Sequence, residues 1–291
     1  MSKYLKPLAA VLVYVVVQGV TCMLALAWTL VDSIKDKAAQ GGAPLFADGN
    51  VPEEMPDVPD GLMSAVIIVS GLITMCVLAK PMGVLRFPQA FDVRSVHWGK
   101  TLTAILGCVA GVLAINLFTE RLHLADWSGD MLTGLMDIPV GIFAVGVMGP
   151  VVEEAIFREA LLGDLLLRKV RPGVAIAISA LIFGCIHANP AQIPGAAFIG
   201  LLLGIVYWRT GNIVLTSLLH IANNLFCVAQ YHVLGDSVAT FTLTDWLGGD
   251  PVALLVMAAS AALCAGLMMR FVRLYPAEQS PLDSDDDLKY A

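Results

Sequence analysis

The chain has 291 residues, of which 58% are hydrophobic and only 14% are charged, and its mean hydropathy is +0.79. Soluble domains carry about 45–50% apolar and about 25% charged residues, so this composition excludes a water-soluble globular protein and indicates a membrane protein. The formal net charge is -7 and the basic residues are scattered, which argues against nucleic-acid binding because no basic stripe could follow phosphates.

Eight apolar runs approach the length of about 20 residues that a helix needs to cross a bilayer core. In chain order they cover 8–31, 61–79, 101–118, 138–167, 174–188, 195–208, 213–230 and 252–269. The fifth and sixth are short for a span. The first is too long for the apolar part of a signal peptide, so we interpret it as an anchor. The predicted fold class is all-α, a polytopic integral membrane protein with about eight transmembrane helices.

The distribution of Lys and Arg between these runs predicts the orientation, because positive residues near helix ends stay in the cytoplasm. With the N-terminus inside, thirteen basic residues are cytoplasmic: Lys3, Lys6, Lys80, Arg86, Arg94, Lys100, Arg168, Lys169, Arg171, Arg209, Arg270, Arg273 and Lys289. The opposite side then holds Lys35, Lys37 and Arg121. We therefore expect a multi-pass protein of the cell (inner) membrane with both termini cytoplasmic.

The apolar runs divide the chain into four regions. Residues 1–137 form three transmembrane helices with their loops, and 138–230 form a core of four helices. Residues 231–270 form an outer loop and the last span, and 271–291 form an acidic cytoplasmic tail, with most of its acidic residues in 280–287. One outer loop is also acidic, through Glu53, Glu54, Asp57 and Asp60.

Six cysteines occur singly inside apolar runs and form no Cys-x-x-Cys pair. We interpret them as small buried hydrophobic residues rather than as a disulfide framework or a zinc site. They are Cys22, Cys76, Cys108, Cys185, Cys227 and Cys264.

The fourth run, 138–167, concentrates buried charge. It places Glu153, Glu154, Arg158 and Glu159 at a depth where each unpaired charge costs at least about 2.5–3.5 kcal/mol. Glu154 and Arg158 are i, i+4 neighbours that can neutralise each other, which is the purely structural interpretation of the cluster. That interpretation leaves Glu153 without a partner on its own helix. Pro150, just before the pair, removes one backbone hydrogen bond and should loosen the helix.

Two later runs each add a protonatable group at helical spacing. Phe183-x-x-x-His187 places a ring and an imidazole on one face of a helix, and His220-x-x-x-Asn224 does the same for an imidazole and an amide. A single intramembrane histidine is more often a packing residue than a catalyst. Two such histidines beside a helix with buried Glu and Arg favour a functional site.

Together these side chains suit water activation in a dry cavity. Glu153 is the candidate general base, and His187 can polarise the water or pass a proton to a leaving amine. His220 and Asn224 can donate hydrogen bonds to the oxyanion of a tetrahedral intermediate. Arg158, paired with Glu154, would fix the orientation of the carboxylates.

These three motifs, in this order on successive apolar runs, resemble the CPBP family of intramembrane proteases, which includes the type II CAAX prenyl endopeptidases and bacteriocin-processing proteins. The resemblance covers about 138–230. It implies hydrolysis of a peptide bond in a membrane-tethered substrate, with Glu153 and His187 activating water. It further implies an oxyanion site at His220 and Asn224, supported by Glu154 and Arg158.

Two features depart from a simple match. The family pattern often continues Phe-Arg-Gly, whereas here Arg158 is followed by Glu159, a further buried charge. Counting about 1.5 Å per residue from the cytoplasmic ends also places His220 roughly 10 Å nearer the cytoplasm than Glu153 and His187.

The same residues leave room for other interpretations. Glu153, His187 and His220 could supply three zinc ligands, but no His-Glu-x-x-His helix is present, so a metal-free glutamate mechanism is favoured. A non-catalytic immunity or scaffolding protein, or a proton-coupled transporter with a Glu and His relay, would also retain a polar cluster. The glycine pairs Gly107/Gly111 and Gly200/Gly204 are typical of close helix packing.

Overall fold

The computed structural model describes residues 5–39, 57–85, 97–235, 237 and 240–275. Within these ranges the secondary structure is helical and no strand is present. Seven helical runs there are long and apolar enough to cross a membrane, and α8 (Pro172–Ile186), with 15 residues, is an eighth apolar helix that is shorter. The prediction of an all-α, polytopic membrane protein is therefore confirmed, with one of the eight expected spans too short to cross by itself.

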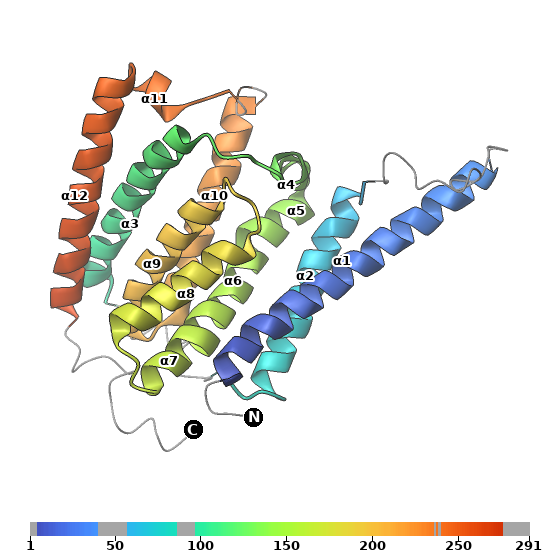
Figure 1. Ribbon diagram of the computed structural model, residues 1–291, viewed down its shortest axis with the longest axis horizontal. Helices are drawn as coiled ribbons and strands as arrows, with labels where there is room; N and C mark the ends of the chain where they lie inside the picture. Colours follow the sequence, from blue (N-terminus) through green and yellow to red (C-terminus); the bar gives the residue numbers. More distant parts are fainter. Residues whose placement is uncertain (1–4, 40–56, 86–96, 236, 238–239, 276–291) are drawn as a thin grey trace.

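An N-terminal hairpin lies at one side of the bundle. It consists of α1 (Leu5–Ala39) and α2 (Asp60–Ala79), which pack against each other, and α1 also packs against the central helical run (Figure 1). With 35 residues α1 is about 52 Å long at 1.5 Å per residue, more than a bilayer core requires. The first apolar run is therefore part of a longer helix than its hydropathy predicts.

The opposite side of the bundle is formed by α3 (Trp98–Thr119) and α12 (Asp250–Leu274), which run side by side (Figure 1). Gly111 permits the close approach of α12, because a Cβ atom there would lie 2.9 Å from Cys264, and also the approach of Leu202, which would lie at 2.8 Å. Gly107 similarly faces Met268. The expected role of this glycine pair in helix packing is confirmed.

The central run is one continuous helical path that changes its hydrogen-bond register twice. It begins with α5 (Pro139–Phe143), continues through the π-helix η4 (Ala144–Met148) into α6 (Gly149–Glu154), and then through the π-helix η5 (Ala155–Gly163) into α7 (Asp164–Leu167). Every side chain of η5 is buried. The paired glutamates end α6, so they lie directly between two π-helical segments, which are often found at functional sites.

Three further helices surround this run. The helices α8 and α9 (Ile193–Thr210) pack along each other, helped by Gly200, where a Cβ atom would lie 3.0 Å from Phe183. The helix α10 (Ile213–Leu234) contacts α6, η4 and η5. Short helices complete the described chain: η3 (Glu120–Leu122), α4 (Gly129–Met136) and α11 (Leu243–Trp246).

The prediction that all six cysteines are buried is wrong. All six are free thiols. The residues Cys76, Cys185 and Cys227 lie exposed on the protein surface, Cys22 and Cys108 are partly buried, and Cys264 is buried. The physical reason is that apolar runs in a membrane protein also face lipid, so an apolar neighbourhood in sequence does not imply burial.

Several expectations concern positions outside the described residues. They are the placements of Lys3, Arg86, Arg94, Lys289, Glu53, Glu54 and the acidic segment 280–287.

Candidate active site

The two adjacent glutamates of α6 lie in different surroundings. The Glu154 side chain is fully buried, and its Oε2 atom lies 3.1 Å from Nε of Arg158, which is also fully buried. The Glu153 side chain retains 16% of its exposure. The i, i+4 ion pair expected from sequence is therefore present, and it leaves Glu153 as the more accessible carboxylate.

The His220 imidazole joins the two glutamates. Its Nδ1 atom donates a hydrogen bond of 3.0 Å to Oε1 of Glu154, and its Nε2 atom lies 3.7 Å from Oε2 of Glu153. The second distance exceeds a hydrogen bond, so Nε2 and the Glu153 carboxylate face each other without a direct bond. Each ring nitrogen of His220 thus faces one carboxylate, and Glu153 has its electrostatic partner on another helix.

This contact overturns the expected depth of His220. A residue roughly 10 Å nearer the cytoplasm than Glu153 could not approach it to 3.7 Å. The rise-per-residue count assumed straight, upright α-helices, whereas the π-helix η5 lies between Glu153 and the cytoplasmic end of the central run.

The ring of Phe183 connects the remaining parts of the site. The guanidinium carbon of Arg158 lies 5.0 Å from the centre of this ring, a cation–π distance. The same ring makes edge-on contacts with His187, at 5.0 Å between centres, and with His220, at 5.6 Å. The contact between His187 and the His220 side of the site is therefore indirect and passes through an aromatic ring.

His187 is the residue directly after the last residue of α8. Its backbone N–H bonds to the Gly184 carbonyl, a tightened last turn, and its Nδ1 atom lies 2.9 Å from the Phe183 carbonyl. Since a carbonyl oxygen can only accept, Nδ1 carries a hydrogen and donates a hydrogen bond to the Phe183 carbonyl. The Nε2 atom of His187 is then the basic nitrogen of the ring.

Asn224 lies one helical turn after His220, and the structure gives its amide a definite partner. Its Nδ2 atom donates a hydrogen bond of 2.9 Å to the Val145 carbonyl in η4. In η4 each N–H bonds to the carbonyl five residues earlier, as the Gly149 N–H does to the Ala144 carbonyl. By this pattern the Val145 carbonyl would accept from the N–H of residue 150. That residue is Pro150, which has no N–H, and Asn224 takes its place. The predicted loosening at Pro150 is thus tied to Asn224.

Glu159, the departure from the family pattern, also has a partner. The Tyr207 hydroxyl on α9 donates a hydrogen bond to its Oε2 atom, and both side chains are buried. This pair links η5 to α9 on the turn next to Arg158. Nothing in the sequence identified Tyr207, because the two residues are 48 positions apart.

Two further polar residues were missed by sequence reasoning. Ser179 donates a hydrogen bond of 2.9 Å to the Phe157 carbonyl, and it stands at i, i+4, i+8 spacing with Phe183 and with His187, which directly follows α8. Asn189, two residues after His187, is 1% exposed and donates hydrogen bonds to Asp126 and Ser128. The i, i+4 spacing was the available signal for Ser179, whereas Asn189 looked like a simple turn residue.

The zinc alternative requires three protein ligands that converge on one point. Across the part of the chain that the structure describes, no group of three or more His, Cys, Asp or Glu side chains has this arrangement. Glu153 and His220 approach each other, but the contacts that hold His187 come from Phe183. The residues present do not fit a three-ligand zinc site.

Comparison with known proteins finds a family and two relatives. Residues 136–226 match the family described as type II CAAX prenyl endopeptidase Rce1-like. The chain is 31% identical over 149 residues to the membrane-embedded CAAX protease MroQ of Staphylococcus aureus (strain USA300), covering 50% of this chain and 60% of MroQ. It is 25% identical over 189 residues to the putative membrane peptidase YdiL of Bacillus subtilis (strain 168), covering 63% of this chain and 77% of YdiL.

The extent of these matches is limited. The matched part spans less than two thirds of MroQ, and the family match ends near the middle of α10. No solved structure matches the chain. The resemblance drawn from the three sequence motifs is nevertheless confirmed for the region that carries them.

Proposed function

Because residues 136–226 match the family described as type II CAAX prenyl endopeptidase Rce1-like, we propose that the protein is an intramembrane endopeptidase acting on a membrane-tethered protein or peptide. The single observation that supports this best is the placement of His220 between two carboxylates, one sealed and one accessible. Such an arrangement separates a positioning group from a reactive one within a single cluster.

The chemical step begins at Glu153. Its carboxylate takes a proton from a water molecule, and the resulting hydroxide attacks the carbonyl carbon of the scissile bond. Glu154 cannot perform this step, because its two oxygens are engaged by Arg158 and His220 and its side chain is fully buried. Glu154 instead holds the imidazole of His220 in a fixed orientation.

The oxyanion of the tetrahedral intermediate requires hydrogen-bond donors. We assign this role to His220 and Asn224, which lie one turn apart on α10. An amide nitrogen carries two hydrogens, so Asn224 can bond the Val145 carbonyl with one and the oxyanion with the other.

Collapse of the intermediate breaks the C–N bond, and the leaving amine needs a proton. His187 is suited to the movement of water and protons on this side, because Nδ1 is fixed on the Phe183 carbonyl and Nε2 is free to accept. The proton that Glu153 removed from water then passes to the amine nitrogen, directly or through His187. Atoms balance with one water consumed and one peptide bond broken.

The orientation of the protein completes the proposal. We place both termini in the cytoplasm and the protein in the cell membrane, on the asymmetry of basic residues. The N-terminal turn of α1 and the C-terminal turn of α12 lie at the same end of the bundle, which agrees with an even number of crossings (Figure 1).

The test is cleavage of peptides anchored by an N-terminal palmitoyl chain, with the protein reconstituted in vesicles and products identified by mass spectrometry. Glu153→Gln should lower the rate at least about 100-fold, the lower range for loss of a general base. Asp164→Asn is the matched control, because Asp164 lies on the same helical run but pairs with Arg168. Equal cleavage by the wild type and Glu153→Gln would refute the glutamate mechanism.

His187→Ala separates the remaining alternatives. A peptidase loses cleavage and keeps its fold, as judged by its thermal transition in detergent. A scaffold that uses His187 for packing loses the fold instead, and a transporter shows altered pH-dependent flux in vesicles without any cleavage of peptides.

A further inference from the structure

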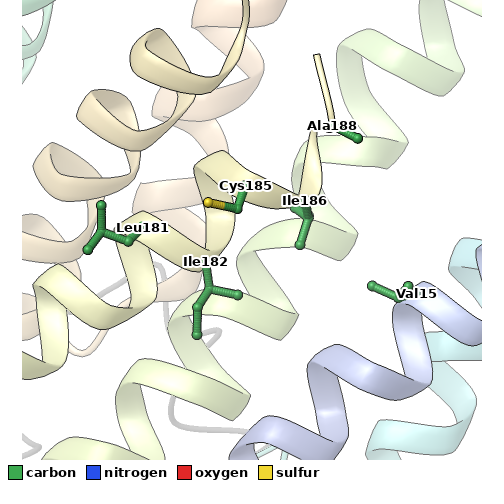
Figure 2. Close-up of a pocket in the computed structure, with 6 residues that line it drawn as sticks. All are labelled: Val15, Leu181, Ile182, Cys185, Ile186 and Ala188. Carbon is green, nitrogen blue, oxygen red and sulfur yellow. The ribbon is translucent and has the colours of Figure 1, made fainter. Parts of the chain in front are cut away.

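The chain changes direction immediately after His187, through a residue with an uncommon backbone conformation. Ala188 has a φ of +52°, in the left-handed region that residues other than glycine rarely adopt. Many helices end with such a residue, but it is usually glycine, because a Cβ atom is strained there. Figure 2 shows Ala188 just beyond the last turn of α8, which carries Cys185 and Ile186. A conformation of this kind persists only where the surrounding contacts impose it.

Asn189 supplies contacts that hold this turn in place. Its side chain is buried, and its Oδ1 atom accepts a hydrogen bond of 3.2 Å from the Trp127 N–H. Its Nδ2 atom donates to Oδ1 of Asp126 at 2.8 Å and to Oγ of Ser128 at 2.7 Å. The oxygen and both hydrogens of the amide are thus engaged by three successive residues of one loop.

Further hydrogen bonds connect the same two segments. The Ala191 N–H donates to the Ala125 carbonyl at 3.2 Å, and the Gln192 side chain donates to Oγ of Ser128 at 3.1 Å. The loop that receives these bonds lies between η3 and α4, ahead of the residues that match the family. The turn after His187 is therefore attached to a part of the chain that lies outside the family match.

The attachment reaches His187 through the backbone. The Ala188 N–H closes the last turn of α8 by a hydrogen bond of 3.1 Å to the Cys185 carbonyl. The same turn carries the hydrogen bond from Nδ1 of His187 to the Phe183 carbonyl. Without the contacts of Asn189, residue 188 would return to a right-handed or extended conformation, because the strain at its φ is then relieved. The last turn would open, and the position of the ring hydrogen would no longer be fixed.

We propose that Asn189 is a positioning residue for His187. By bonding the loop before α4 it holds the left-handed turn at Ala188, and this turn keeps the His187 imidazole in one tautomer and one orientation, with Nε2 as the basic nitrogen. The proposal rests on the proposed peptidase function and adds to it a residue that acts without touching the substrate. It also gives the loop ahead of the family match a part in the chemical step.

The experiment determines the His187 tautomer by NMR, a measurement that does not depend on cleavage. The imidazoles are labelled with nitrogen-15 and observed in vesicles at alkaline pH, where they are neutral. The His187 signals are those missing from His187→Ala. We expect only the Nδ1–H tautomer in the wild type and both tautomers in Asn189→Ala. In the cleavage assay kcat of Asn189→Ala should fall by up to about 100-fold with KM little changed, because a misplaced group slows the chemical step.

An exchange of two side chains tests the proposal even if Asn189→Ala does not fold. Asn189→Asp alone places its carboxylate beside that of Asp126, so the contact is lost and both tautomers should appear. The double variant Asn189→Asp/Asp126→Asn restores one donor and one acceptor in exchanged positions. The single Nδ1–H tautomer and most of the lost kcat should then return.

Thr244→Val is the matched control. Thr244 lies on α11 and its hydroxyl bonds Glu120 and Arg121, so this variant also breaks a polar connection between two segments of the chain. It should leave the His187 signals and kcat as they are in the wild type.

The outcomes separate the positioning role from the peptidase activity. A single Nδ1–H tautomer in both Asn189→Ala and Asn189→Asp would overturn the positioning role, even if these variants cleave slowly. Two tautomers in the double variant would overturn it as well. If the tautomer depends on Asn189 but the wild type cleaves no peptide, the positioning of His187 stands and the proposed function is refuted.

Discussion

Glu153 and Glu154 are chemically identical neighbours, and only their environments separate their roles. Glu154 is sealed, with one oxygen toward Arg158 and the other accepting from His220. Glu153 is partly exposed and faces the Nε2 atom of His220 at 3.7 Å. A carboxylate that is fully buried and paired with a buried guanidinium cannot reach a substrate water, so the assignment of the base to Glu153 follows from burial and contacts rather than from the motif alone.

The first prediction concerns the buried ion pair. Glu154→Gln leaves the Arg158 charge buried without a counter-charge, so the free energy of unfolding should fall by about 3 kcal/mol. Unfolding by SDS in mixed detergent micelles measures this change. The double variant Glu154→Gln/Arg158→Met should recover most of the loss, because an apolar side chain then contacts Phe183. If Glu154→Gln had the same free energy of unfolding as the wild type, the ion pair would not contribute to stability.

The second prediction concerns Asn224. Asn224→Ala removes the donor to the Val145 carbonyl and should cost about 1 kcal/mol of unfolding free energy, in addition to its effect on cleavage. Asn223→Ala is the control, because the amide of Asn223 donates to the Asn224 side chain oxygen at 3.3 Å and not to the Val145 carbonyl. A purely catalytic Asn224 would lose cleavage while the unfolding midpoint stays unchanged.

At the scale of elements, sequence reasoning succeeded where spacing alone determines proximity. Residues at i and i+4 share a helix face, so the pairs Phe183/His187 and Glu154/Arg158 could be predicted to share an environment. Contacts between helices, such as Tyr207 with Glu159 or Asn224 with Val145, depend on helix rotation and depth, which hydropathy does not encode. A count that assumes straight, upright α-helices therefore misplaced the depth of His220 relative to Glu153.

The third prediction tests the register of the central run. Pro150→Ala restores an N–H that can bond the Val145 carbonyl, so it competes with Asn224 and favours a more regular helix. We expect the free energy of unfolding to rise by about 1 kcal/mol while cleavage falls, because Glu153 is moved relative to His220. Detergent unfolding and the vesicle cleavage assay measure the two effects.

Pro139→Ala serves as the control for this variant. Pro139 begins α5, where a missing N–H costs nothing, so its replacement should leave both quantities nearly unchanged. If Pro150→Ala were more stable and fully active, the irregular register would have no part in placing Glu153.

At the scale of the whole molecule, the distribution of charge follows from the alternation of the helices. Lys80, Lys100, Arg168, Arg171 and Arg273 belong to turns or helix ends that, by alternation, lie on one side. Arg121 and the end of α1 belong to the other side. The polar network that fixes the turn after His187, through Asn189 and Asp126, lies on the side with few basic residues. The turn that follows His187 is therefore fixed by contacts on the side opposite the predicted cytoplasmic face.

The last prediction tests this orientation with two single cysteines at exposed positions in described loops. Leu124→Cys lies in the turn before α4, and Arg171→Cys lies in the turn between α7 and α8. A membrane-impermeant maleimide added to intact cells should label residue 124 and not residue 171, and permeabilised cells should allow labelling of both. The native cysteines lie within the helices, so the unmodified chain gives the background. The reverse pattern would place the termini outside, because the asymmetry of Lys and Arg would then point to the wrong face.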